Sequence, residues 1–122
     1  MQALRAVHIV FGWTAIGANA LAGVVALVAF GVPRARGRWV WVVTIVAEAM
    51  MMLEVVMGVV LLSGDRYEVE RFHMFYGFVA FLTVGLAFQY RDALRGRAEL
   101  LYGLVGLFMM GLGLRAVVEV GA

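Results

Sequence analysis

The stretch Arg71-Phe72-His73-Met74-Phe75-Tyr76-Gly77 marks the point where a charged segment gives way to a long apolar one. The same local pattern of a histidine, two apolar residues, an aromatic residue and a glycine occurs near the start of the chain, as His8-Ile9-Val10-Phe11-Gly12. Side chains four residues apart lie on one face of a helix, so each glycine would leave open space beside the ring of its histidine. The two stretches therefore predict a pair of matched helices, each with a histidine near one end.

The composition predicts a membrane protein. Apolar residues make up 65% of the 122 residues, against about 45–50% in soluble domains. A soluble core of this size could not bury so much apolar surface, whereas a bilayer could cover it. The chain contains no cysteine, which excludes disulfides, thiolate metal sites and thiol catalysis. Its ten basic residues are all arginine and occur in short clusters, and the net charge of the chain is only +2. We therefore expect no nucleic-acid partner.

Four apolar segments account for most of the chain, roughly 4–31, 39–62, 72–90 and 99–120. Each is close to or above the length of about 20 residues that a helix needs to cross a bilayer. Short connections place neighbouring helices antiparallel. The sequence therefore predicts a single all-α domain over 1–122, a four-transmembrane-helix up-and-down bundle. The first segment is expected to stay as an uncleaved membrane helix, because no convincing cleavage site follows it.

The charged residues between these segments predict the orientation in the membrane. Loop 32–38 carries three arginines and no acid, and loop 91–98 carries three arginines with one acid, whereas loop 63–71 mixes both signs. Arginine favours the cytoplasmic side of a membrane. We therefore expect loops 32–38 and 91–98 to be cytoplasmic, and both termini and loop 63–71 to lie outside.

Two further matches indicate an internal repeat. Arg36-Gly37-Arg38 recurs as Arg95-Gly96-Arg97, and Met50-Met51 recurs as Met109-Met110 at the same separation. Apolar sequence of low complexity also produces such matches by chance, so duplication and coincidence are equally open. If the repeat is real, the chain is two tandem helical hairpins related by a pseudo-two-fold axis along the membrane normal. The first and third helices would then lie diagonally, with their histidines facing each other.

Ionisable side chains within the apolar segments are the first candidates for function, because charges in a bilayer are costly and usually face the bundle interior. Glu54 and Arg115 come at nearly the same height above the cytoplasmic loops, which predicts an ion pair between the second and fourth helices. Glu119 follows Arg115 by one helical turn and could share it. The pair would either clamp two helices together, or gate a path or orient a ligand.

Glu48 lies near the middle of the second helix, with no basic residue at comparable depth. We expect its carboxyl to be neutral there, because desolvation disfavours the charged form. Asn19, near the middle of the first helix, is its expected hydrogen-bond partner. The bond would either hold two helices together or mark a carboxyl that relays protons.

The two histidines allow four interpretations. In the first, each only bonds a neighbouring loop at the end of its helix. In the second, they are the axial ligands of one b-type haem, with room for the macrocycle beside the glycines and an arginine for a propionate. In the third, they join a carboxylate in a divalent metal site. In the fourth, they handle protons, because imidazole titrates near neutral pH. The expected cofactor residues are His8, His73, Gly12, Gly77 and Arg115, and the expected metal ligands are His8, His73 and Glu54.

A resemblance covers most of the chain. Residues 73–78, His-Met-Phe-Tyr-Gly-Phe, and residues 102–116, Tyr-Gly-Leu-Val-Gly-Leu-Phe-Met-Met-Gly-Leu-Gly-Leu-Arg-Ala, resemble a group of small bacterial four-helix integral membrane proteins. The resemblance implies the fold and a bacterial inner membrane, and it implies no activity. The likeness to membrane b-type cytochromes is one of layout, with two histidines on alternate helices of a bundle.

We carry three hypotheses for the function. The leading one is a small integral membrane protein with a cofactor or metal at the outer end of the bundle, most concretely one haem b, in an electron-transfer or redox-accessory role. The second is a proton-coupled transporter or channel formed by oligomers of this chain. The third is a structural accessory subunit of a larger membrane complex. Enzymatic activity is open under all three.

Overall fold

Each of the four apolar segments forms one α-helix. The computed structural model describes residues 2–64 and 71–119, the last of them by its backbone only. The helices are α1 (Gln2–Gly31), α2 (Arg38–Ser63), α3 (Arg71–Tyr90) and α4 (Ala98–Glu119), with a short 3-10 helix, η1 (Pro33–Ala35), between the first two. All four α-helices are long and apolar enough to cross a membrane. The predicted all-α fold and its four membrane segments are therefore confirmed, and the chain is a multi-pass membrane protein.

The end of α1 shows how the chain stops one helix and begins the next. Pro33 lacks a backbone N–H and cannot continue an α-helix, so α1 ends at Gly31. The last carbonyl groups of a helix have no partner within it. Arg36 supplies one, because its Nε donates to the carbonyl of Ala29 at 2.7 Å and its Nη2 to that of Phe30 at 2.6 Å. The side chain of Arg36 therefore binds the end of α1 and tightens the turn into α2.

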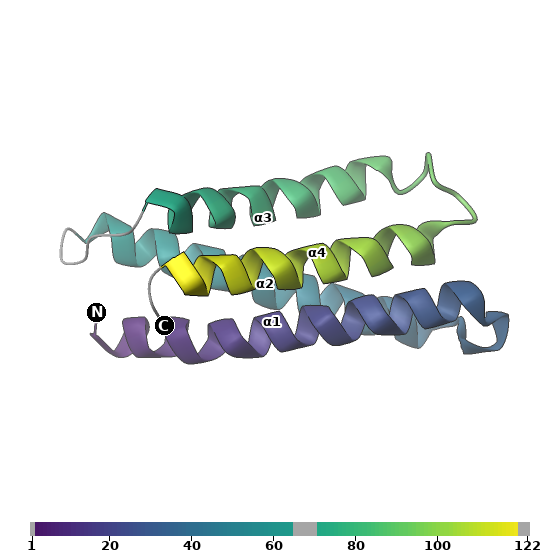
Figure 1. Cartoon of the computed structure of the whole chain (residues 1–122), viewed down its shortest axis with the longest axis horizontal. Coiled ribbons are helices and arrows are strands. Elements are labelled where there is room, and N and C mark those ends of the chain that lie inside the picture. The colour runs from purple at the N-terminus through teal and green to yellow at the C-terminus, as the bar shows by residue number, and fades with distance from the viewer. Residues whose placement is uncertain (1, 65–70, 120–122) are drawn as a thin grey trace.

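The helices run alternately up and down (Figure 1). α1 packs closely against α2 and α4, and α4 also packs against α3, whereas α2 and α3 touch less. α1 and α3 consequently lie diagonally across the bundle. We call the end that carries His8, His73, the start of α1 and the end of α4 the histidine end, and the end that carries loops 32–37 and 91–97 the arginine end.

Glycines let α1 and α4 approach until their backbones touch. A Cβ at Gly106 would lie 2.7 Å from the Cα of Gly23 and 2.8 Å from the carbonyl oxygen of Asn19. Small residues at such crossings allow membrane helices to pack closely. The small face of α1 that carries this contact is fully buried, and it comprises Gly12, Ala15, Asn19 and Gly23.

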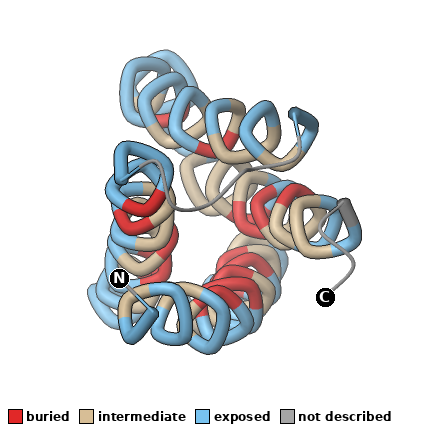
Figure 2. The backbone as a smooth tube through the Cα atoms, turned by 90° about the vertical axis from the view of Figure 1, so that its left-hand side faces the viewer, coloured by how far each residue is buried: buried red, intermediate tan, exposed pale blue. Residues whose placement is uncertain are grey.

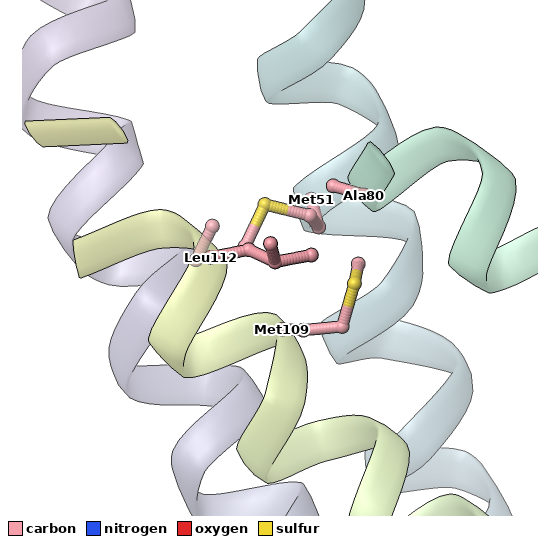
Figure 3. Packing of buried hydrophobic residues seen from close by; sticks show 5 residues of the cluster. Met51, Ala80, Met109 and Leu112 are labelled. Atoms are coloured by element: carbon pink, nitrogen blue, oxygen red, sulfur yellow. The ribbon is translucent and has the colours of Figure 1, made fainter. Parts of the chain in front are cut away.

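Methionines fill the centre of the bundle (Figure 3). Met51 of α2 and Met109 of α4 meet Ala80 of α3 and Leu112 of α4 in one buried cluster. Buried residues face the middle of the four helices, while the outer faces are exposed (Figure 2). In α3 only 11% of the membrane-length segment is buried within the bundle. The bilayer must therefore cover most of the apolar surface of this helix.

Candidate functional site

The histidine end brings together the two histidines of the chain. α1 and α3 run in the same direction, so His8 and His73, each near the start of its helix, reach the same level of the bundle. Their ring centroids lie 6.2 Å apart, and the ring planes are inclined by 81°. Both side chains are half-buried. Two imidazoles from diagonal helices thus share one location.

Glu54 lies beside the first of these rings. Its Oε1 is 3.2 Å from Nδ1 of His8, and the two side chains are only 14% and 17% exposed. The atoms are at ion-pair distance but not aligned as a hydrogen bond, and neither has another hydrogen-bond partner in the described part of the chain. A Cβ at Gly58, one turn further along α2, would lie 3.3 Å from Cε1 of His8. Glycine at this position therefore leaves room for the Cε1–Nε2 edge of the ring beside α2.

The two glycines that were expected to leave space beside the histidines behave differently. A Cβ at Gly12 would lie 2.5 Å from Oε2 of Glu54, so Gly12 makes room for the carboxylate. The expectation of open space was wrong at this position, because α2 fills it. Beside Gly77, by contrast, nothing lies within 4 Å of the place where a Cβ would be.

His73 is oriented by α4. Its Nδ1 lies 2.8 Å from the carbonyl oxygen of Ala116. A carbonyl can only accept a hydrogen bond, so Nδ1 carries the proton and Nε2 of the neutral ring is free to act as a ligand or acceptor. The side chain of His73 is thereby held in one tautomer and one direction.

Arg115 of α4 contacts Tyr76, which lies about one turn along α3 from His73. Its Nε donates to the hydroxyl of Tyr76 at 3.5 Å, and its guanidinium carbon lies 5.8 Å from the centre of the Tyr76 ring. The partner that the structure gives Glu54 is His8, where the sequence predicted Arg115. The predicted depth of Glu54 in the membrane does not explain this choice of partner. α2 packs against α1, and the Glu54 side chain points toward α1 and not toward Arg115 on α4. The side chain of Glu119, which was expected to share Arg115, lies outside the described residues.

Asn19 bonds a backbone carbonyl and not Glu48. The side chain is 1% exposed, and its Nδ2 donates to the carbonyls of Ala15 at 2.9 Å and Ala47 at 3.0 Å. The predicted Asn19–Glu48 bond is therefore wrong. Consecutive side chains on a helix point about 100° apart. Ala47 thus faces α1, while Glu48 turns away from it.

Glu48 instead faces a hollow at the arginine end. The hollow has a volume of about 500 Å³ and is lined by α2, the end of α3, loop 91–97 and the start of α4. Sequence reasoning missed it, although one signal was available. Spacings of three and four residues separate Trp41, Thr44 and Glu48, which places the three side chains on one face of α2.

No set of three or more histidine, aspartate and glutamate side chains in the described residues could hold a metal ion. The predicted ligands His8, Glu54 and His73 are neighbours, but they do not form such a set. A haem needs only the two axial imidazoles from the protein, because the macrocycle supplies the other ligands.

Comparison of the chain with models of protein families, with curated proteins and with solved structures gives no match. The membrane fold that the sequence resemblance implied is present, and no family is shown. A function can therefore be argued only from the residues of the site.

Proposed function

We propose that the chain is a small multi-pass membrane protein that binds one b-type haem between His8 and His73, in an electron-transfer or redox-accessory role. The observation that carries the proposal is the approach of the two imidazoles from diagonal helices, with 6.2 Å between their centroids. Two imidazoles bound to one metal through bonds of about 2.0–2.1 Å have ring centres on the order of 6 Å apart. The separation therefore matches axial ligation of a single iron.

The orientation of both rings supports the same proposal. Nδ1 of each histidine lies near an acceptor: the Glu54 carboxylate is 3.2 Å from His8, and the Ala116 carbonyl is hydrogen-bonded to His73. Histidines that bind a metal usually present their second nitrogen to a carboxylate or carbonyl, which raises the basicity of the ligating nitrogen. Nε2 of His73 would then bind the iron, and Nε2 of His8, which lies close to Gly58 of α2, would bind it once the ring turns away from that helix. Bundle cores commonly hold cofactors in this way.

The neighbouring residues would position the group. Haem supplies one-electron chemistry, and its potential depends on the axial ligands and the groups hydrogen-bonded to them. The open space beside Gly77 would take one edge of the macrocycle. Arg115, already close to Tyr76, would meet a propionate through charge-assisted hydrogen bonds.

Visible spectra of the purified protein test the proposal. Expression with added 5-aminolevulinic acid should yield protein with a Soret band and with the sharp reduced bands of bis-histidine iron. His8→Ala and His73→Ala should each lose most of the bound haem, while Gln89→Ala, at the other end of α3, should keep it. Folded protein without a Soret band and without iron would overturn the proposal. Zinc and copper measured in the same sample would test the metal alternative.

Proton handling is the second candidate, and the contact between Glu54 and His8 favours it. A carboxylate 3.2 Å from an imidazole, with a second imidazole against the first, is a row of three titratable groups in the outer part of the bundle. Proton flux into liposomes should then be lower with the Glu54→Gln variant than with the wild-type protein. Flux that is unchanged in the variant, or absent from both proteins, would contradict proton handling and favour a structural role in a larger complex. Native mass spectrometry from mild detergent would detect such a complex.

A further inference from the structure

The hollow at the arginine end has the size and the polar groups of a ligand site. Its volume of about 500 Å³ lies within the range of about 300–1,000 Å³ that is usual for small-molecule sites. It lies where α2 and α3 draw apart toward the arginine end (Figure 1). Glu48 and Thr44 line it on α2, and Tyr102 of α4 and Phe88 of α3 lie across from them.

Two polar side chains of this hollow lack a partner in the described part of the chain. Thr44 is only 4% exposed, and its Oγ1 makes no hydrogen bond there. Glu48, one turn further along α2, forms neither a hydrogen bond nor an ion pair with any described residue. Buried polar groups are normally satisfied, because an unpaired one has lost its hydrogen bonds to water without gaining others. A bound molecule that contacts both groups would make up for this loss.

Aromatic rings form the other walls. Trp41 and Tyr102 meet edge to face, with ring centroids 5.7 Å apart and planes inclined by 82°. Phe88 completes the aromatic lining. Aromatic faces attract cations through the negative charge of their π-systems, and they bind organic ammonium ions in particular. We propose that this hollow binds a lipophilic organic cation in exchange for the proton of Glu48, so that the carboxylate neutralises the charge of the cation while its apolar groups contact Trp41 and Tyr102.

The charged residues at the mouth of the hollow carry both signs. The guanidinium of Arg91 lies 3.6 Å from the centre of the Phe88 ring, and its Nη1 donates to the Phe88 carbonyl. Asp92 and Arg95, of opposite charge, line the hollow from the same loop. Two arginines and one aspartate leave the mouth with a net charge of +1, so the Glu48 carboxylate further inside is the group that would attract a cation.

The depth of Glu48 sets the chemical class of the ligand. The residue comes ten positions after Arg38, which places it about 15 Å into the bundle from the arginine end. A small hydrated ion would find one carboxylate there and few other oxygen ligands. A cation that spreads its charge over apolar groups gives up less hydration and gains contact with the rings.

Two ions of the same shape and opposite charge test the proposal on the unmodified protein. Tetraphenylphosphonium should bind in a saturable manner, measured by equilibrium dialysis in detergent and by quenching of tryptophan fluorescence. Tetraphenylborate should bind at least about tenfold more weakly. Equal binding of both ions would show partition into apolar surface, and tighter binding of the borate would indicate an anion site at Arg91 and Arg95. Either result would overturn the proposal.

Variants assign the binding to the hollow. Glu48→Gln should weaken phosphonium binding at least about tenfold, Glu48→Asp should restore part of it, and Thr44→Val should weaken it less. Glu99→Gln, which removes an acid near the same end outside the hollow, should bind as the wild type does. Circular dichroism and gel filtration check that the variants fold. Wild-type affinity in Glu48→Gln would reject the site. The measurement needs no haem, so its outcome is independent of the function proposed for the histidine end.

Discussion

At the scale of the residue, the two carboxylates of α2 have entirely different surroundings. Glu54 meets the Nδ1 of His8, whereas Glu48 faces a hollow beside Thr44. Six residues separate them, which turns their side chains about 120° apart around the helix. α2 therefore directs Glu54 toward α1 at the histidine end and Glu48 into the hollow at the arginine end.

The contact between His8 and Glu54 should appear as an energetic coupling. Glu54→Gln and His8→Ala should each lower the free energy of unfolding by about 1–3 kcal/mol, because each leaves the other polar group buried without its partner. The double variant should lose less than the sum of the two, by about 0.5–3 kcal/mol, as neighbouring residues do. Denaturation in detergent followed by circular dichroism measures all four proteins of this cycle.

The same cycle with Arg115→Met in place of His8→Ala is the control. Since the structure pairs Glu54 with His8, the coupling between Glu54 and Arg115 should be the smaller of the two. A larger coupling to Arg115 would mean that α2 is rotated toward α4, and it would remove the basis for placing Glu54 at the histidine site.

At the scale of the element, the helices differ in how they are held. α1 and α4 meet through backbone atoms at Gly23 and Gly106. α3 contributes mainly Ala80 and Ala87 to the buried surface, and its large apolar side chains point outward. The bundle is therefore built on the α1–α4 contact, and α3 is held less closely.

Adding one methyl group to this contact should destabilise the bundle. In Gly106→Ala the new Cβ would overlap the backbone of α1, which cannot move without separating the two helices. We expect a loss of about 1–3 kcal/mol, as for overpacked cores. Gly111→Ala, on the same helix with nothing within 4 Å of its Cβ position, should be neutral or slightly stabilising, because alanine favours helix more than glycine. Equal thermal shifts of both variants would contradict the close crossing.

At the scale of the whole molecule, the loops 32–37 and 91–97 lie at one end of the bundle (Figure 1), and the two histidines lie together at the other. The arginines of those two loops predict that the arginine end faces the cytoplasm. The histidine site would then lie near the outer surface, and the hollow with Glu48 would open toward the inner half of the membrane.

Cysteine labelling tests this orientation directly, because the chain has no cysteine of its own. In intact cells a membrane-impermeant maleimide should label Ser63→Cys and leave Ala93→Cys unlabelled. Permeabilised cells should label both, which confirms that the second thiol is accessible. Labelling of Ala93→Cys alone in intact cells would reverse the orientation and exchange the sides of the two sites.

The four membrane helices, their antiparallel order and the polar residues within them could all be predicted from the amino-acid sequence. Length and apolar composition are local properties, and the end of α1 at Gly31 follows from Pro33 just after it. The tight face of α1 around Gly23 was also visible as a stripe of small residues.

Which polar groups contact each other could not be predicted from the sequence and follows from the packing of the helices. Glu54 lies beside His8, Asn19 bonds the carbonyl of Ala47, and Glu48 faces a hollow. These choices depend on the rotation of each helix about its own axis. In a soluble helix the apolar stripe reveals that rotation. In a membrane helix that is apolar on nearly all sides, the lipid-facing and bundle-facing surfaces look alike in sequence, so depth can be derived from residue numbers but direction cannot.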